Sequence, residues 1–289
     1  MRRALQSVLC GLLFQLVAAH SEDVGQQLKQ GLQNYLQKPS QPNPQQPAAG
    51  PSLRVLLGGV PEQEEVAIGR QIAGNLLGAA PLVKDRALQI YVNDVGRWVA
   101  SHSERPDLQW HFGVIESDDV NAFSIPGGYV YITRGLYRLL RSEADLAGVL
   151  GHEIGHVVRK HHLKLLQQSR LAELSSTLLS KQFGENEQIR NVVGSGAEIV
   201  SRSLDKQAEF EADRMAVVLA TRAGYDPFGL PEVLQAIGHI AKDEGAVALL
   251  FKTHPLPDAR LTALDRAMGN RFDSIDGQTL AGRLYRLKR

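Results

Sequence analysis

Two histidines and a glutamate in one short run have the types and spacing to bind a metal ion and activate water. His152 and His156 are four residues apart, so on a helix both imidazoles lie on one face and can ligate a single ion. Glu153 follows the first histidine and lies beside the metal, where a carboxylate can take a proton from water. Zinc accepts imidazole and carboxylate ligands and, with three protein ligands, keeps one position open for water. The run therefore predicts one hydrolytic zinc ion per chain.

A third protein ligand must come from another part of the chain. His162 lies six residues beyond His156, but an arginine stands where a helix-ending glycine would be needed, so a continuing helix carries His162 away from the metal. Glutamates on later helical segments are the other candidates: Glu173, Glu185, Glu187, Glu198, Glu209 and Glu211. Of these, Glu209 is followed four residues later by Asp213, which can accept a hydrogen bond from the far nitrogen of a ligand histidine. The alternative is that Glu209, Glu211 and Asp213 form a charged helix face.

These motifs resemble a known family. Gly-His-Glu-x-x-His at 151–156, followed by Glu-x-x-x-Asp at 209–213, is similar to the gluzincin peptidases related to HtpX and to the CAAX prenyl protease, most of all to their soluble, exported bacterial members. The resemblance covers most of residues 60–270 and includes Asn121-Ala122-Phe123, Pro126-Gly127-Gly128 and Thr253-His254-Pro255. It implies a zinc-dependent endopeptidase with Glu153 as general base, and a part in the quality control of envelope proteins.

Two further features bear on the open coordination position. His254 could stabilise the oxyanion of the reaction, or cap the zinc as a fourth ligand and hold the enzyme latent, and a solvated loop histidine is the alternative. Residues 121–124 precede the metal-binding helix, and in the resembling family this region is an active-site edge strand. An extended substrate could add to such an edge by main-chain hydrogen bonds, although an ordinary hairpin would give the same pattern.

The elements that must position these residues are mostly helical. Apolar spacing predicts helices over 62–77, 85–101 and 143–162, with Ser142 as the N-cap of the last, which carries the metal motif. Strands are expected over 108–115 and on both sides of the turn at 126–128. The fold class is therefore α+β: a mainly helical, zincin-like metalloprotease domain over residues 53–289, with a small mixed β-sheet at its edge.

The N-terminal region predicts export. Residues 1–19 carry two arginines, an apolar run and small residues at 17–19, which is typical of a cleaved signal peptide. That run is short for a membrane span, so no transmembrane segment is expected in the mature protein, and an uncleaved anchor is the alternative. Residues 20–52 predict a helical segment and a Pro/Gln-rich linker. We expect a periplasmic protein, although a secreted or membrane-anchored one would look similar.

The charge and cysteine content of the chain exclude some classes of partner and metal site. The formal net charge of +1 and the lack of a basic stripe argue against nucleic-acid binding. Cys10 is the only cysteine and lies within the expected signal peptide, so a cysteine-ligated metal is excluded from the mature protein. Polypeptide substrates are the expected partners, with outer-membrane assembly components as a further candidate. The alternative function is a periplasmic chaperone or assembly factor whose zinc is structural or permanently capped, which the proline-rich linker would suit.

Overall fold

The structure is a computed structural model that describes residues 60–168, 204–240 and 245–287. The expected signal peptide (1–19) and the helical segment and linker (20–52) lie outside these residues. So do four of the alternative metal-binding glutamates: Glu173, Glu185, Glu187 and Glu198.

A small sheet and two helices make up the first part of the fold. Helices α3 (Glu62–Ala79) and α4 (Arg86–Ala100) precede the strands β1 (His111–Ile115), β2 (Ala122–Ile125) and β3 (Tyr129–Thr133). The three strands have the order β1-β3-β2. β1 and β3 are parallel, whereas β2 runs antiparallel to β3, so the sheet is mixed and β2 lies at its edge. No other strand of the described part of the chain pairs with the outer side of β2, and an edge strand of this kind can pair with another chain.

Helices dominate the remainder. The α-helices are α5 (Arg134–Leu139), α6 (Glu143–Val158), α9 (Lys206–Arg222), α10 (Gly229–Gly238), α11 (Ala248–Thr253) and α12 (Pro257–Met268). Short 3₁₀ helices cover Gly245–Val247 and Ala281–Arg283. The predicted α+β class, mainly helical with a small mixed sheet, is confirmed. Among the described helices, none combines the length and hydrophobicity that a membrane span requires.

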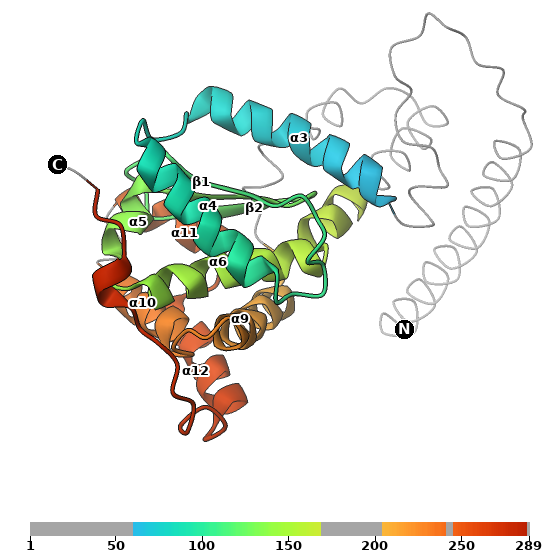
Figure 1. The fold of residues 1–289 in the computed structure, drawn as a ribbon. Coiled ribbons are helices and arrows are strands. Elements are labelled where there is room, and N and C mark those ends of the chain that lie inside the picture. Colours follow the sequence, from blue (N-terminus) through green and yellow to red (C-terminus); the bar gives the residue numbers. More distant parts are fainter. Residues whose placement is uncertain (1–59, 169–203, 241–244, 288–289) are drawn as a thin grey trace, which may run out of the picture. The chain divides into compact units, whose positions relative to one another are not determined.

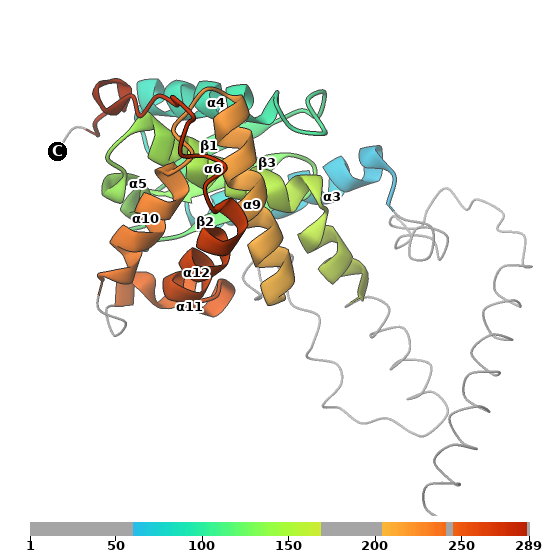
Figure 2. The same ribbon diagram turned by 90° about the horizontal axis from the view of Figure 1, so that it is seen from below.

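Helix α6 lies at the centre of the arrangement. In Figure 1 it runs between the sheet and the group formed by α9, α10 and α12, while α3 covers the other face of the sheet. Figure 2, seen from below, shows α9 crossing α6. All 16 residues of α6 are buried, including the whole metal motif. A helix buried on every side must find partners for its polar side chains, and the neighbouring helices supply them.

The start of α6 agrees with the prediction, but its end does not. Ser142 caps the helix by accepting from the Asp145 amide, and the Asp145 side chain accepts from the Ser142 amide in return. The expected helix over 143–162 is wrong at its C-terminal end, because α6 stops at Val158 and residues 161–168 form a separate helical segment. Lys160 adopts a left-handed conformation with φ of 57°, which an uninterrupted helix cannot contain.

Buried Glu65 of α3 holds that break in place. Its carboxylate lies 3.3 Å from Lys160 Nζ and 2.8 Å from Arg105 Nη1. The same carboxylate accepts a hydrogen bond from the Gly127 amide in the turn between β2 and β3. One side chain therefore links α3, the strand turn and the end of α6. These are contacts between distant parts of the sequence, which a local helix pattern cannot anticipate.

Candidate metal centre

Close packing of α6 against α9 brings the sequence motifs together. A Cβ atom added at Gly151 would lie 3.1 Å from Ala216 Cα, and one added at Gly155 would lie 3.2 Å from Ala212 Cα. The glycines thus let α9 approach nearly to backbone contact. Because Glu209 and Asp213 share a helix face with these alanines, they are carried toward the α6 histidines.

Four side chains converge on one point. The Nε2 atoms of His152 and His156 are 3.0 Å apart. Glu209 places Oε1 3.5 Å from His156 Nε2 and Oε2 3.7 Å from His152 Nε2. With His254, each residue offers one ligand atom, and these atoms all lie within 4.8 Å of one another. The structure therefore brings together the three predicted metal ligands and the predicted fourth residue.

The arrangement fits a metal ion. Ligands of a tetrahedral zinc ion lie roughly 3.3 Å apart, close to the separations of the imidazole and carboxylate atoms. Glu209 Oε1 is buried and has no hydrogen-bond partner within the described residues, an expensive state that a bound cation would relieve. Burial lowers the pKa of His156 well below its ordinary value, which favours the neutral imidazole that ligates metals. The donor set thus fits a single metal ion, and its atoms are those that zinc accepts.

His152 is supported by a buried ion pair. Its Nδ1 lies 2.8 Å from Asp213 Oδ1, the orientation predicted from the sequence. Arg260 holds the same carboxylate with two contacts, Nη2 to Oδ1 at 2.5 Å and Nε to Oδ2 at 3.0 Å. Burial alone would raise the pKa of the Asp213 carboxyl, but Arg260 and His152 hold it well below its ordinary range. Asp213 therefore remains an acceptor and fixes the His152 ring with Nε2 toward the metal position.

Arg260 was not predicted, although the sequence contained a signal. The buried positions of α12 are Pro257, Arg260, Leu264 and Met268, which follow helical spacing. An arginine on the apolar face of an amphipathic helix must find a buried acid.

His156 has a different support, a chain of side chains that leads outward. Its Nδ1 lies 2.9 Å from His161 Nδ1. The Nε2 of His161 lies 3.5 Å from Glu211 Oε2, and Arg159 Nε lies 2.9 Å from Glu211 Oε1. If His156 ligates through Nε2, its Nδ1–H donates to His161, whose own N–H then faces Glu211. His161 was not predicted to belong to the site, but its buried ring contacts a predicted metal ligand.

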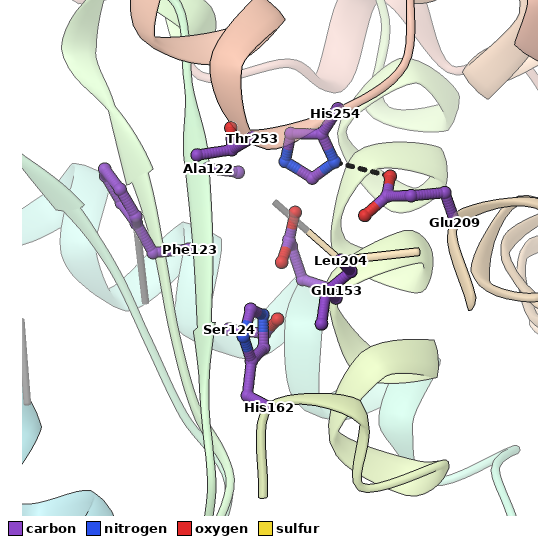
Figure 3. Close-up of a pocket in the computed structure, with 9 residues that line it drawn as sticks. All are labelled: Ala122, Phe123, Ser124, Glu153, His162, Leu204, Glu209, Thr253 and His254. Carbon is purple, nitrogen blue, oxygen red and sulfur yellow. Dashed lines mark hydrogen bonds and ion pairs between the residues drawn. The ribbon is translucent and has the colours of Figure 1, made fainter. Parts of the chain in front are cut away.

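A pocket opens beside these residues (Figure 3). It is lined by Ala122, Phe123, Ser124, Glu153, His162, Leu204, Glu209, Thr253 and His254. Glu153, the predicted base, lies between His254 and His162 in Figure 3. His254 Nδ1 is 2.6 Å from Glu209 Oε2. Burial alone would lower the pKa of His254, but the Glu209 carboxylate raises it.

His162 also lies in this pocket, contrary to the argument that a continuous helix would carry it away. The break at Lys160 redirects the chain, and the His162 ring centroid lies 5.6 Å from that of His156. His162 is nevertheless not among the four residues whose ligand atoms converge. The geometric reason for rejecting His162 as a metal ligand was therefore wrong, and the rejection itself stays a prediction.

The amino-acid sequence of this chain is similar to those of several known proteases. The chain is 33% identical over 208 residues to the beta-barrel assembly-enhancing protease of Escherichia coli (strain K12), an alignment that covers 68% of this chain and 42% of that protein. It is 29% identical over 168 residues to the mitochondrial metalloendopeptidase OMA1 of Arabidopsis thaliana, covering 58% and 33% of the two chains. Metalloprotease YcaL of Escherichia coli (strain K12) is 28% identical over 147 residues, covering 50% and 57%.

The chain thus spans less than half the length of the first of these relatives. The profile of Peptidase family M48 matches residues 86–268, which include every residue of the candidate metal centre. The resemblance predicted from the two metal motifs is confirmed. The chain belongs to peptidase family M48.

Proposed function

We propose that this protein is a zinc-dependent endopeptidase in which His152, His156 and Glu209 hold the metal and Glu153 is the general base. One observation carries the proposal: Glu153 lines the same pocket as Glu209 and His254, two of the four converging residues, beside the edge strand β2. Zinc bound there would acidify a water molecule and polarise the scissile carbonyl. Glu153 accepts the proton of the attacking water and passes it to the departing amine.

Strand β2 gives this site a way to hold a polypeptide. Within the described residues it is paired on one side only, with β3, and Ala122, Phe123 and Ser124 line the pocket. A substrate in extended conformation can add to the free edge through main-chain hydrogen bonds. Such binding orients the scissile bond over Glu153 without depending strongly on the substrate's sequence.

His254 has two proposed roles that the geometry permits. It belongs to the converging cluster, so it can occupy the coordination position that hydrolysis needs and hold the enzyme latent. Alternatively it swings away from Glu209 and donates to the oxyanion. The 2.6 Å contact with Glu209 also supports the second candidate function, a chaperone or assembly factor with a permanently capped metal.

The proposed setting is the bacterial periplasm. Residues 1–19 would act as a cleaved signal peptide and 20–52 as a linker to the protease domain at 53–289. The relative named beta-barrel assembly-enhancing protease supports misfolded or unassembled envelope proteins as substrates, and outer-membrane assembly components as partners. Intact-mass measurement of the protein purified from the periplasm tests the cleavage, which should remove residues 1–19.

The catalytic proposal is tested by digesting denatured casein with the parent and with Glu153→Gln, while measuring zinc content. Glu153→Gln should keep its zinc and lose about 10²- to 10⁴-fold in rate, the range expected for a general base. Glu62→Gln, on the exposed start of α3, is the matched control and should match the parent. Cleavage by Glu153→Gln at the parental rate would refute the mechanism.

His254→Ala separates the remaining alternatives. A cap predicts faster cleavage in this variant, whereas an oxyanion donor predicts a loss of about 10²- to 10³-fold. A chaperone would hold zinc and leave casein intact in both the parent and His254→Ala.

A further inference from the structure

Two polar atoms in the pocket have no role in the proposed catalytic machinery. Ser124 Oγ and His162 Nδ1 are buried and have no hydrogen-bond partner within the described part of the chain. The residues are only 1% and 9% exposed, respectively, and both line the pocket next to Glu153. Glu209 Oε1 is also unpartnered there, but a metal ion accounts for it. Ser124 and His162 need another explanation.

Leaving these atoms unpaired is costly. A buried donor or acceptor without a partner costs about 1–3 kcal/mol. The two residues also come from separate elements, since Ser124 lies on edge strand β2 and His162 follows the break at Lys160 (Figure 3). Each side chain is therefore placed independently in the same pocket, and a bound group that pairs with both would recover the cost.

The chemistry of the two residues indicates what that group is. The imidazole of His162 offers one donor and one acceptor in its neutral form, and its Nδ1 is buried in the pocket. The Ser124 hydroxyl likewise donates and accepts. Among the described lining residues there is neither lysine nor arginine, so a carboxylate would meet Glu153 and Glu209 without a side-chain counterion from them. An apolar side chain would leave both atoms unpaired.

A carboxamide matches both partners. Its oxygen accepts and its nitrogen donates, and the two atoms are separate, so one can reach β2 while the other reaches His162. We propose that Ser124 and His162 form a polar subsite that selects substrates with an asparagine or glutamine side chain beside the scissile bond. This inference rests on the proposed endopeptidase function and specifies its substrates.

Matched peptides test the subsite. Quenched fluorescent peptides of one parent sequence carry Gln or Met, and Asn or Leu, at each position flanking the cleaved bond. At one of these positions, the parent enzyme should favour the carboxamide member by at least about tenfold in kcat/KM, as expected when an apolar analogue leaves a polar site unpaired. Ser124→Ala and His162→Phe should bring that ratio close to one without changing zinc content. His162→Asn, which keeps a donor and an acceptor, should restore part of it.

Binding provides a readout that does not depend on turnover. Glu153→Gln, loaded with zinc, should bind the Gln peptide several-fold more tightly than the Met peptide, by fluorescence anisotropy. Adding Ser124→Ala should remove the difference, whereas Ser101→Ala, on the exposed end of α4, should keep it.

The outcomes separate the two proposals. If neither the parent nor His254→Ala cleaves any of the peptides, the endopeptidase function is contradicted, and the binding ratio then decides the subsite alone. Equal cleavage and equal binding of matched pairs would overturn the subsite, since the two atoms would then hold only water. If His162→Phe fails to fold, the smaller change Ser124→Ala decides the result.

Discussion

The two histidines of α6 look equivalent in the sequence, yet the fold supports them in opposite ways. His152 contacts Asp213, which is 1% exposed and held by the buried guanidinium of Arg260. His156 contacts His161, whose other nitrogen faces Glu211, a carboxylate with 41% of its side chain exposed. The contacts that support His152 end in the interior of the protein, and those that support His156 end at its surface.

The difference matters because charges act more strongly where water is excluded. The Asp213–Arg260 pair is shielded from salt and cannot be replaced by solvent, so it fixes His152 rigidly. The chain from His156 passes through a neutral ring to charges that water and ions screen. We infer that the buried Asp213–Arg260 pair determines the stability of the candidate metal centre. The His161–Glu211 contacts instead adjust the position and basicity of His156.

Removing Arg260 should have the largest effect on folding. Arg260→Ala leaves the Asp213 carboxylate buried with one partner fewer, and breaking a buried pair costs about 3–5 kcal/mol. Urea unfolding of the metal-free protein measures the loss. Arg266→Ala, an exposed residue of the same helix, is the control and should change the free energy of unfolding by no more than about 0.5 kcal/mol. Equal values for the two variants would show that the interior pair does not stabilise the fold.

Removing His161 should weaken metal binding more than folding. His161→Phe keeps the ring shape but deletes the acceptor for His156 Nδ1–H, and loss of such a partner reduces metal affinity by about tenfold or more. Competition with a chromogenic chelator gives the zinc dissociation constant, and the Co²⁺ spectrum reports the ligand geometry. His239→Phe replaces an exposed ring and should leave both unchanged. Parental affinity in His161→Phe would remove His161 from the metal centre.

Neutralising the surface end of that chain should have a smaller effect that depends on salt. Glu211→Gln loses an exposed charge interaction, which is worth about 1 kcal/mol or less. The zinc dissociation constant should rise by less than about fivefold at low ionic strength, and the change should shrink in 1 M salt, where screening acts over about 3 Å. A large effect that persists in high salt would mean that the two supports are alike after all.

A difference in backbone strain is expected at the break that separates the two supports. Lys160→Gly and Lys160→Val both lose the ammonium group that faces Glu65. Glycine accepts the left-handed backbone freely, whereas a β-branched residue there is strained. The glycine variant should therefore be more stable than the valine variant by about 1 kcal/mol or more. Thermal unfolding of the two variants, compared at equal zinc, measures this difference, and the opposite order would contradict it.

Much of the fold followed from local patterns. The helices over α3 and α4, the strands beside the 126–128 turn and the Ser142 cap were predicted because each depends on residues close in sequence. The end of α6 was not, since the break at Lys160 is held by Glu65, 95 residues earlier. Helical spacing carries no information about such a tertiary contact.

The candidate site was likewise predictable only where it depends on spacing within a single helix. His152, His156 and Glu209 were found because motif spacing on two helices encodes their faces, and the structure brings them together. Arg260 and His161 were missed, although a basic residue at a core position of α12 pointed to the first. His162 and Ser124 meet the pocket from elements whose relative placement depends on the whole fold.

The left-handed residue at 160 also constrains the length of the chain. A helix turns by about 100° per residue, so adding or deleting one residue at the junction would rotate the segment that follows by that angle. His161 and His162 would both leave their neighbours in one step. Loops elsewhere on the surface can accommodate insertions. The junction between Val158 and His161 must instead keep the same number of residues, even if its side chains change.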